Sequence, residues 1–414
     1  MIKVGLNIGN SKISCAVLET KENQDFKLLS CESYPTKTLK KNLITNFDEL
    51  LNETKFLIDE SEKKSQTKIN SINLNIPTID SISKYYESEI EILKNEITEL
   101  DVKKAINKSD FFAINEDYHE LYNNIYAYIL DNNLLSNSPI GNYGQNLKIL
   151  FYKILIPNKI FNSYKNIVNR LNIKVDNFVP MPVSSSLAVL SEDEKTIGSI
   201  CIDLGHSNTS VSIFENNNFI YGDSVLVGSN NITNDIARGV STTIDSAERL
   251  KTLYSSLISA PSDEYEIIEV PIISGENDKF VQINRLKINS IVKPRVEETL
   301  EMIWQKLKQN NLHKKQIKNV VLTGGGSQLE GISQYAELIF SSNVRIGYPK
   351  EGLVSDESMK NSSFADVIGC SLFDPDIYLD KIIEKQGKKQ KKQGFGGFFN
   401  WLDQYIWYTT YRFL

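Results

Sequence analysis

The chain has 414 residues, enough for two or more domains, and its 41% hydrophobic and 24% charged side chains are ordinary for a globular protein. The 46 basic and 52 acidic residues give a net charge of −6, which argues against a protein whose main role is to coat nucleic acid. The four cysteines are scattered, so we expect reduced core residues rather than a disulfide or zinc framework. The sequence contains neither an apolar run of roughly 18 residues nor a secretory signal pattern, which predicts a cytoplasmic protein.

Short strand and helix patterns alternate along the first half of the chain, beginning with a hairpin around the turn Gly9–Lys12. Segment 85–135 is rich in tyrosine and asparagine, and we expect helical patches in it, such as Asp101–Lys108. The predicted elements of this half are strands over 2–8, 13–18 and 26–30, a helix over 47–63, a strand over 69–77, the patches just described, a strand over 147–156 and a helix over 162–171.

Segment 197–214 repeats the design of the opening hairpin. Ile200–Gly205 is a strand pattern that enters a polar turn, and Thr209–Phe214 returns as a second strand, as Val4–Gly9 and Ile13–Leu18 do at the start of the chain. A repeated unit of this kind indicates an internal duplication and predicts two related halves.

The second half continues with helix and strand patterns up to an expected end of the folded body near Asp374. Its predicted elements are helices over 232–237 and 246–254, the latter opened by Thr243 and Asp245, an irregular strand region over 265–288, an amphipathic helix over 293–307, a strand over 319–323 and a helix over 331–340.

Three glycine-bearing turns follow strands, at Gly9, at Gly205 and at Gly324–Gly326. A backbone without side chains brings N–H groups close to oxyanions, so such turns suit phosphate binding. None has the spacing of a P-loop or of a Rossmann fingerprint. A single turn of this type is more often an ordinary hairpin, but the joint presence of all three favours a nucleotide site.

The segments Ile8–Lys12, Ile202–Thr209 and Leu322–Ser327 resemble the two phosphate motifs and the adenosine motif of the actin–Hsp70–sugar kinase superfamily. Within it, three further stretches are similar to the FtsA family of bacterial division proteins. These are Val227–Gly239, Ala247–Lys251 and Ser138–Gly141. The resemblance covers essentially the whole chain. It implies an α/β, actin-like ATPase fold of two duplicated lobes, with an FtsA-type inserted subdomain and a C-terminal amphipathic helix.

The resemblance also implies a division of the chain into segments. The first lobe takes 1–82 and 165–195 as its core (subdomain 1A), interrupted by the inserted, SHS2-like subdomain 1C over 83–164. The second lobe takes 196–228 as the first part of its core (2A), 229–315 as subdomain 2B, and 316–380 as the rest of the core with a return helix. A basic linker over 381–394 and a membrane-targeting helix over 395–414 complete the chain.

By resemblance, ATP and Mg²⁺ occupy the space between the lobes, and Asp203 holds the metal through water. Glu248 and Lys251, which share a helix face, are expected to face the ribose, although a surface ion pair on that helix is the alternative. The residues expected to bind nucleotide are Gly9, Asn10, Ser11, Lys12, Asp203, Gly205, His206, Ser207, Asn208, Thr209, Glu248, Lys251, Gly324, Gly325, Gly326 and Ser327.

The sequence departs from the family's motifs at several of these turns. Asn7 stands where the first motif usually carries an acid, and Ser210 stands where the second ends in an aspartate. His206 and Ser207 replace two glycines. Asp203 is then the one carboxylate in the two turns, and spacing identifies no general base or other catalytic residue. We therefore expect nucleotide binding with slow or absent ATP hydrolysis.

The last twenty residues form an aromatic-rich amphipathic pattern, preceded by six lysines between Lys381 and Lys392. Such a helix suits the membrane interface, and the lysines suit anionic lipid. Docking on the protein's own body or on a partner is the alternative, which the polar tether makes less natural. The residues expected at the membrane are Phe395, Phe398, Phe399, Trp401, Leu402, Tyr405, Ile406 and Trp407.

The resemblance further implies a protein that polymerises on the cytoplasmic face of the inner membrane at the division site. It would tether filaments of the tubulin-like FtsZ (the Z ring) and help recruit later division proteins, without binding nucleic acid. Segment 229–315 is expected to bind the FtsZ tail, with Lys293 and Arg295 as contacts or, equally, as solvated helix charges. The inserted subdomain is expected to contact a neighbouring subunit. The alternatives are a PilM-like pilus-assembly adapter and a small-molecule kinase of the same superfamily.

Overall fold

The computed structural model describes residues 1–20, 26–93, 96–109, 116–135, 138–258, 260–273, 280–315, 317, 319–350 and 359–375. By contacts the chain forms one unit over Met1–Asp374 and a second over Pro375–Leu414. The predicted basic linker and membrane helix lie outside the described residues, and every element below belongs to the first unit. No helix among the described residues is long and apolar enough to cross a membrane.

The first lobe is built on a five-stranded sheet with the order β11-β6-β1-β2-β3. Its antiparallel part confirms the predicted opening hairpin. On the other side β6 pairs parallel with β1, and β11 pairs parallel with β6. Helix α1, which Asn46 caps by accepting from the Glu49 backbone N–H, packs against β2 and β3. The elements of this lobe are β1 (Ile2–Ile8), β2 (Lys12–Thr20), β3 (Phe26–Pro35), β4 (Leu39–Lys40), β5 (Leu43–Ile44), α1 (Phe47–Ser65), β6 (Ser71–Ile76), α3 (Asn158–Arg170) and β11 (Lys174–Pro180).

The second lobe repeats this sheet with the order β14-β13-β12-β17-β18. Strand β12 pairs antiparallel with β13 and parallel with β17, just as β1 pairs with β2 and β6. The matching topology confirms the internal duplication. The elements of this core are α5 (Glu192–Ile197), β12 (Ser199–Leu204), β13 (Thr209–Glu215), β14 (Asn218–Val225), β17 (Asn319–Thr323), α9 (Ile332–Phe340) and β18 (Asn343–Ile346), with 3-10 turns over Leu312–Lys315, Gly325–Gln328 and Ser362–Phe364.

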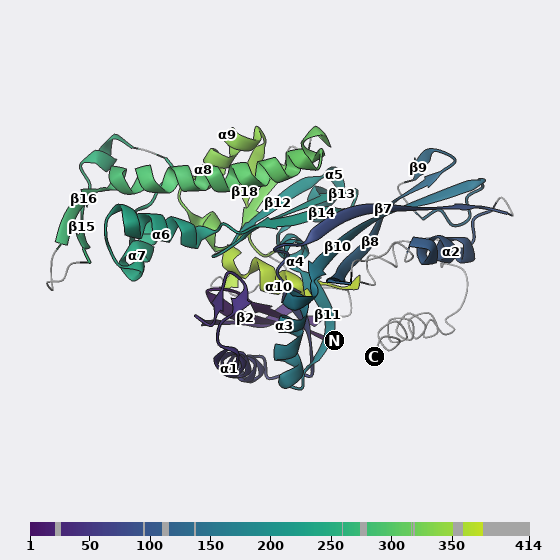
Figure 1. The fold of residues 1–414 in the computed structure, drawn as a ribbon, viewed down its shortest axis with the longest axis horizontal. Helices are drawn as coiled ribbons and strands as arrows, with labels where there is room; N and C mark the ends of the chain where they lie inside the picture. The colour runs from purple at the N-terminus through teal and green to yellow at the C-terminus, as the bar shows by residue number, and fades with distance from the viewer. Residues whose placement is uncertain are drawn as a thin grey trace. The chain divides into compact units, whose positions relative to one another are not determined.

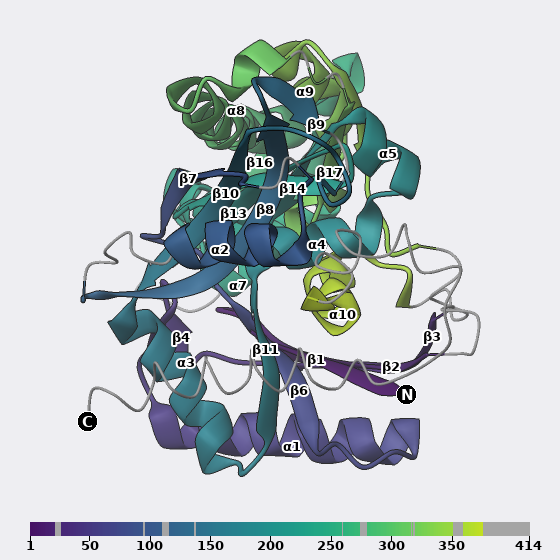
Figure 2. The same ribbon diagram turned by 90° about the vertical axis from the view of Figure 1, so that its right-hand side faces the viewer.

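Two short helices, α4 (Met181–Val189) and α10 (Ala365–Leu372), join the two sheets. Figure 2 shows α10 between α4 and the sheet of β1 and β2. Every residue of α4 is buried, and α10 is apolar apart from its first turn. The two helices approach at backbone distance, because a Cβ added to Gly369 would lie 1.6 Å from the Ser184 carbonyl oxygen. Only glycine fits at this crossing.

The inserted segment forms a third sheet, with the order β7-β10-β8-β9 (Figure 1). The prediction of helical patches over 85–135 is wrong except for α2, because residues of this segment pair with β10 along its length. Tyr152 anchors this sheet to the second lobe, since its hydroxyl accepts from the Gly222 N–H and donates to the Gly222 carbonyl. The elements are β7 (Ile82–Glu91), α2 (Glu99–Ser109), β8 (Tyr118–Leu130), β9 (Asn133–Leu135) and β10 (Asn146–Pro157).

Helices and a hairpin extend the second lobe between β14 and β17 (Figure 1). The long helix α8 begins at Arg285 rather than at the predicted Lys293, because Asn284 caps it and buried Ile288 and Val292 continue its apolar face. Pro294 is accommodated in the interior of this helix. The elements are α6 (Ser229–Gly239), α7 (Ile244–Tyr254), a 3-10 turn over Pro261–Glu264, β15 (Ile267–Pro271), β16 (Phe280–Asn284) and α8 (Arg285–Gln309).

The four cysteines are buried and free, as the sequence predicted.

Replacing Gly369 by alanine should lower the free energy of unfolding by about 1–3 kcal/mol or more, because the new methyl group would overlap the α4 backbone. Gly325→Ala is a matched control, since its Cβ would have no neighbour closer than 3.8 Å. Its unfolding free energy should change by no more than about 0.5 kcal/mol. Denaturant unfolding of both variants measures the difference, and equal stabilities would contradict the importance of this crossing.

Candidate functional site

The three glycine-bearing turns open onto one cavity of about 910 Å³. It also receives the start of α6, one face of α7 and residues 361–366. Thr209 and Ser327, also predicted to bind nucleotide, are not among its lining residues; their buried hydroxyls donate to the Val227 and Gly324 carbonyls and stabilise the turns. The predicted residues that line the cavity are Gly9, Asn10, Ser11, Lys12, Asp203, Gly205, His206, Ser207, Asn208, Glu248, Lys251, Gly324, Gly325 and Gly326.

The two hairpin turns close in the same way. The Gly9 N–H donates to the Lys12 carbonyl at 3.0 Å, and the Gly205 N–H donates to the Asn208 carbonyl at 3.0 Å. A Cβ at Gly9 or at Gly205 would come within 2.9 or 2.8 Å of those same carbonyl oxygens. Each turn therefore requires glycine, and each presents its tip to the cavity at the carboxyl end of a strand.

The triple-glycine turn follows β17 and packs against β12. Gly324 has a φ of +83°, and a Cβ there would lie 2.1 Å from the Asp203 Oδ1 atom. Gly326 also approaches β12 closely, since its Cβ would lie 2.9 Å from the Leu204 carbonyl oxygen. The absence of side chains brings the backbone of this turn beside the Asp203 carboxylate.

Glu248 and Lys251 face the cavity from α7, where they form an ion pair of 2.7 Å. The Thr233 hydroxyl donates to Glu248 at 2.6 Å and accepts from Lys251 at 3.0 Å. Burial opposes ionisation of Glu248, but these hydrogen bonds outweigh it and lower its pKa. Burial and the nearby Lys251 charge lower the pKa of His206, against a smaller opposite effect of Glu248, so its imidazole is neutral near pH 7.

Asp203 and Asp366 also line this cavity, and the charge of each affects the other. The pKa of Asp203 is raised to about 7. Burial is the main cause and the negative charge of Asp366 adds to it, whereas the Ser185 hydrogen bond and the Lys12 charge lower the pKa. Burial also raises the pKa of Asp366, against the Lys12 charge and hydrogen bonds that include one from Asn7. Lys12 donates to the Ser363 carbonyl at 2.9 Å and lies 4.1 Å from the centre of the Phe364 ring.

Sequence reasoning missed Asp366, because it considered only carboxylates within the glycine turns. The available signal was a lone charge at the start of the apolar stretch Ala365–Leu372. A half-buried carboxylate in an apolar stretch is not explained by packing and indicates a polar partner or a functional role.

The oxygen donors around the cavity fit Mg²⁺ carried by a nucleotide. Within the described part of the chain, no group of three or more His, Cys, Asp or Glu residues forms a metal cage. Two carboxylates and a phosphate chain match the preference of Mg²⁺ for oxygen ligands and retained waters. Asp203, the residue predicted to hold the metal through water, is one of these oxygen donors.

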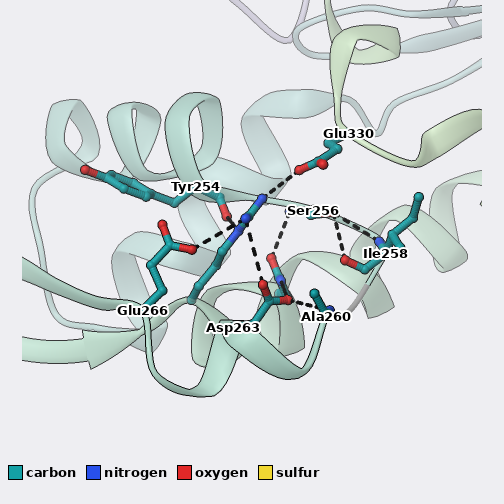
Figure 3. Close-up of polar contacts among 9 residues, drawn as sticks. Tyr254, Ser256, Ile258, Ala260, Asp263, Glu266 and Glu330 are labelled. Carbon is teal, nitrogen blue, oxygen red and sulfur yellow. Dashed lines mark hydrogen bonds and ion pairs between the residues drawn. The ribbon is translucent and has the colours of Figure 1, made fainter.

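Glu330 lines the cavity and belongs to a polar cluster with Tyr254, Asp263 and Glu266 (Figure 3). Arg285 connects these residues. The guanidinium donates to the Tyr254 carbonyl at 2.9 Å and to the Glu330 carboxylate at 2.6 Å. Buried Asp263 lies 3.8 Å from the same guanidinium and accepts from the Asn289 amide. Because Tyr254 ends α7 and Glu330 follows the triple glycine, Arg285 ties these two walls together.

Lys293 and Arg295 lie on α8, away from the cavity lining. Arg295 forms an ion pair of 2.5 Å with Asp235 and a second with Glu298. The Lys293 ammonium lies 5.3 Å from the centre of the Tyr335 ring. An acidic peptide that used Arg295 would therefore compete with two internal carboxylates.

Comparisons with known proteins agree with this architecture. A family model described as "Cell division protein FtsA" matches residues 200–369. The cell division protein FtsA of Agrobacterium fabrum is 28% identical over 394 residues, covering 92% of this chain and 88% of that protein. Among solved structures, the "PilM-PilN type IV pilus biogenesis complex" matches with a TM-score of 0.61 at 15% identity, covering 89% of this chain and 97% of that one. MreB5 of Spiroplasma citri bound to ADP matches with a TM-score of 0.54 at 12% identity, covering 92% and 98%.

Asp203→Asn should stabilise the nucleotide-free protein more at pH 8 than at pH 5. The folded-state pKa of about 7 exceeds the ordinary 3.8, so ionisation of Asp203 lowers the stability of the folded protein. This destabilisation is absent below pH 4, where the side chain is protonated in both states, and complete above pH 7. The asparagine removes this cost and can still accept from Ser185. Denaturant unfolding at both pH values measures the gain, and a gain independent of pH would contradict the assignment.

Proposed function

The chain belongs to the FtsA family of actin-like cell division proteins, and from this we propose that it is an ATP-binding membrane tether of the division ring. In this proposal ATP and Mg²⁺ occupy the cavity, and the protein polymerises on the cytoplasmic face of the inner membrane at the division site. Its partners are the tail of FtsZ, other copies of itself, the membrane and later division proteins. The observation that carries the proposal is the meeting of all three glycine turns at one cavity.

The chemistry of the cavity supports a nucleotide as its ligand. The two hairpin tips offer backbone N–H groups to phosphates, Lys12 offers a positive charge, and the paired carboxylates offer acceptors for metal-bound water. The Glu248–Lys251 pair lines the cavity from α7, where it suits the hydroxyls of a ribose. MreB5, which shares the fold, carries ADP. We infer slow or absent hydrolysis, because neither the sequence spacing nor the described residues of the cavity identify a group dedicated to activating water.

Lys251→Ala should weaken binding of a fluorescent ATP analogue about tenfold, because it removes a charged hydrogen-bond donor from the cavity wall. Arg249→Ala is the matched control, since it removes an exposed positive charge from the same helix without touching the cavity lining. Fluorescence titration of the full-length variants measures both affinities. Equal losses in the two variants would indicate general electrostatics, and no binding by the unmodified protein would contradict the nucleotide site.

The tether role depends on the C-terminal sequence. An aromatic amphipathic helix gains energy in the membrane interface, and each of the upstream lysines gains on the order of 1 kcal/mol near anionic lipid. A single helix of this kind binds weakly, so polymerisation would hold FtsZ filaments at the membrane through many simultaneous contacts. Nucleotide binding between the lobes would favour the polymer.

Vesicles with anionic lipid should sediment the full chain, and ATP should increase the bound fraction. A chain that ends at Gln393 should remain in the supernatant with and without ATP, because it lacks the amphipathic helix. Added FtsZ should sediment with the vesicles only when the full chain is present. Binding of the shortened chain to vesicles would contradict the role of residues 395–414 as the tether. If the full chain binds vesicles but FtsZ does not sediment with it, FtsZ is not the partner.

A PilM-like adapter is the second candidate, favoured by the match of fold to the PilM–PilN complex. That likeness concerns the fold alone at 15% identity. The vesicle experiment separates the two roles, because the tether requires binding through residues 395–414 and recruitment of FtsZ.

A further inference from the structure

Asp366 opens helix α10 at the edge of the cavity. It is the one charged residue of a helix whose other positions are small or apolar, and its carboxylate accepts from the Val367 backbone N–H in the first turn. An acid in the first turn is favoured by the helix dipole, so the charge alone does not indicate a ligand site. Its second oxygen accepts from the Asn7 amide, which places the carboxylate beside the first hairpin at the cavity.

Comparison of the two duplicated hairpins shows that the first one lacks a carboxylate that the second one has. Asn7 in β1 and Asp203 in β12 occupy equivalent positions, since Asn7 pairs with Ser14 in register and Asp203 pairs with Ser210. Each lies two residues before the glycine of its hairpin turn. The second lobe thus presents a carboxylate to the cavity where the first lobe presents an amide.

A chain of hydrogen bonds fixes the orientation of that amide. The Ser184 hydroxyl donates to the Asn75 side-chain oxygen at 2.8 Å, and the Asn75 amide donates to the Asn7 side-chain oxygen at 3.3 Å. The Asn7 amide N–H groups are therefore directed away from Asn75, and one of them donates to an Asp366 oxygen. Asn7 serves as the donor that holds the Asp366 carboxylate in place.

We propose that Asp366 supplies from α10 the carboxylate that the first hairpin lacks, so that Asp203 and Asp366 together receive the waters of nucleotide-bound Mg²⁺. This proposal rests on the proposed nucleotide site and assigns it a second acidic residue. The negative charge beside the first hairpin is then carried by α10, which packs against β1 although it comes after the second lobe in the sequence.

The test measures the affinity of the full-length protein for a fluorescent ATP analogue in Mg²⁺ and in EDTA. Asp366→Asn should weaken binding about tenfold in Mg²⁺, because an acceptor for metal-bound water is lost. It should strengthen binding in EDTA, because a negative charge no longer repels the phosphates. Asn7 can still donate to the new side-chain oxygen, so the local hydrogen bond is retained.

The double variant Asn7→Asp with Asp366→Asn should restore the unmodified ratio of the two affinities. Its new aspartate still accepts from Asn75 and now also accepts from the new asparagine at 366, so both hydrogen bonds are kept and the second one reverses its direction. Asp374→Asn is the matched control. Asp374 lies just after the same helix, but its carboxylate pairs with Lys3 and does not line the cavity. This control should keep the unmodified ratio.

An unchanged ratio in Asp366→Asn, or failure of the exchange to restore it, would overturn the proposal while leaving the nucleotide site intact. Absence of binding by the unmodified protein in both buffers would instead overturn the nucleotide site and the proposal together.

Discussion

The backbone contact between α4 and α10 is the constraint on which the rest of the structure depends. Gly369 leaves room for the Ser184 carbonyl, and Gly5 leaves room for the Val367 carbonyl on the other side of α10. Helix α10 is thereby held between a strand of the first sheet and the helix that packs on the second. Because each approach is made by backbone rather than by side chains, the two duplicated lobes meet at a distance that no larger residue permits.

This contact also determines the polar chemistry of the cavity. Ser184 and Ser185 are neighbours on α4, yet one bonds to Asn75 in the first sheet and the other to Asp203 in the second. Helix α10 brings Asp366 to the end of β1. The helices that join the lobes therefore also position the groups that face the ligand, so a change in the crossing would reach both hairpins at once.

Charge in the cavity is balanced locally rather than by the chain as a whole. The net charge of −6 gives no indication of where charges gather. Lys12 opposes the charges of Asp203 and Asp366, and Lys251 opposes the charge of Glu248 on α7. Arg285 performs the same role behind the wall, where it neutralises buried Asp263. These pairs allow acidic groups to remain in a partly buried site without the full cost of desolvation.

The sequence by itself determined the duplicated hairpins, the glycine turns and most strand and helix positions, because these depend on local periodicity and on glycine's backbone freedom. It also supplied the C-terminal amphipathic pattern. It did not determine that segment 85–135 pairs as strands, that α8 starts at Arg285, or that Asp366 meets Asn7. Each of those depends on a partner far away in the chain, and only tertiary packing decides which distant side chain completes a strand, a helix face or a pair of carboxylates.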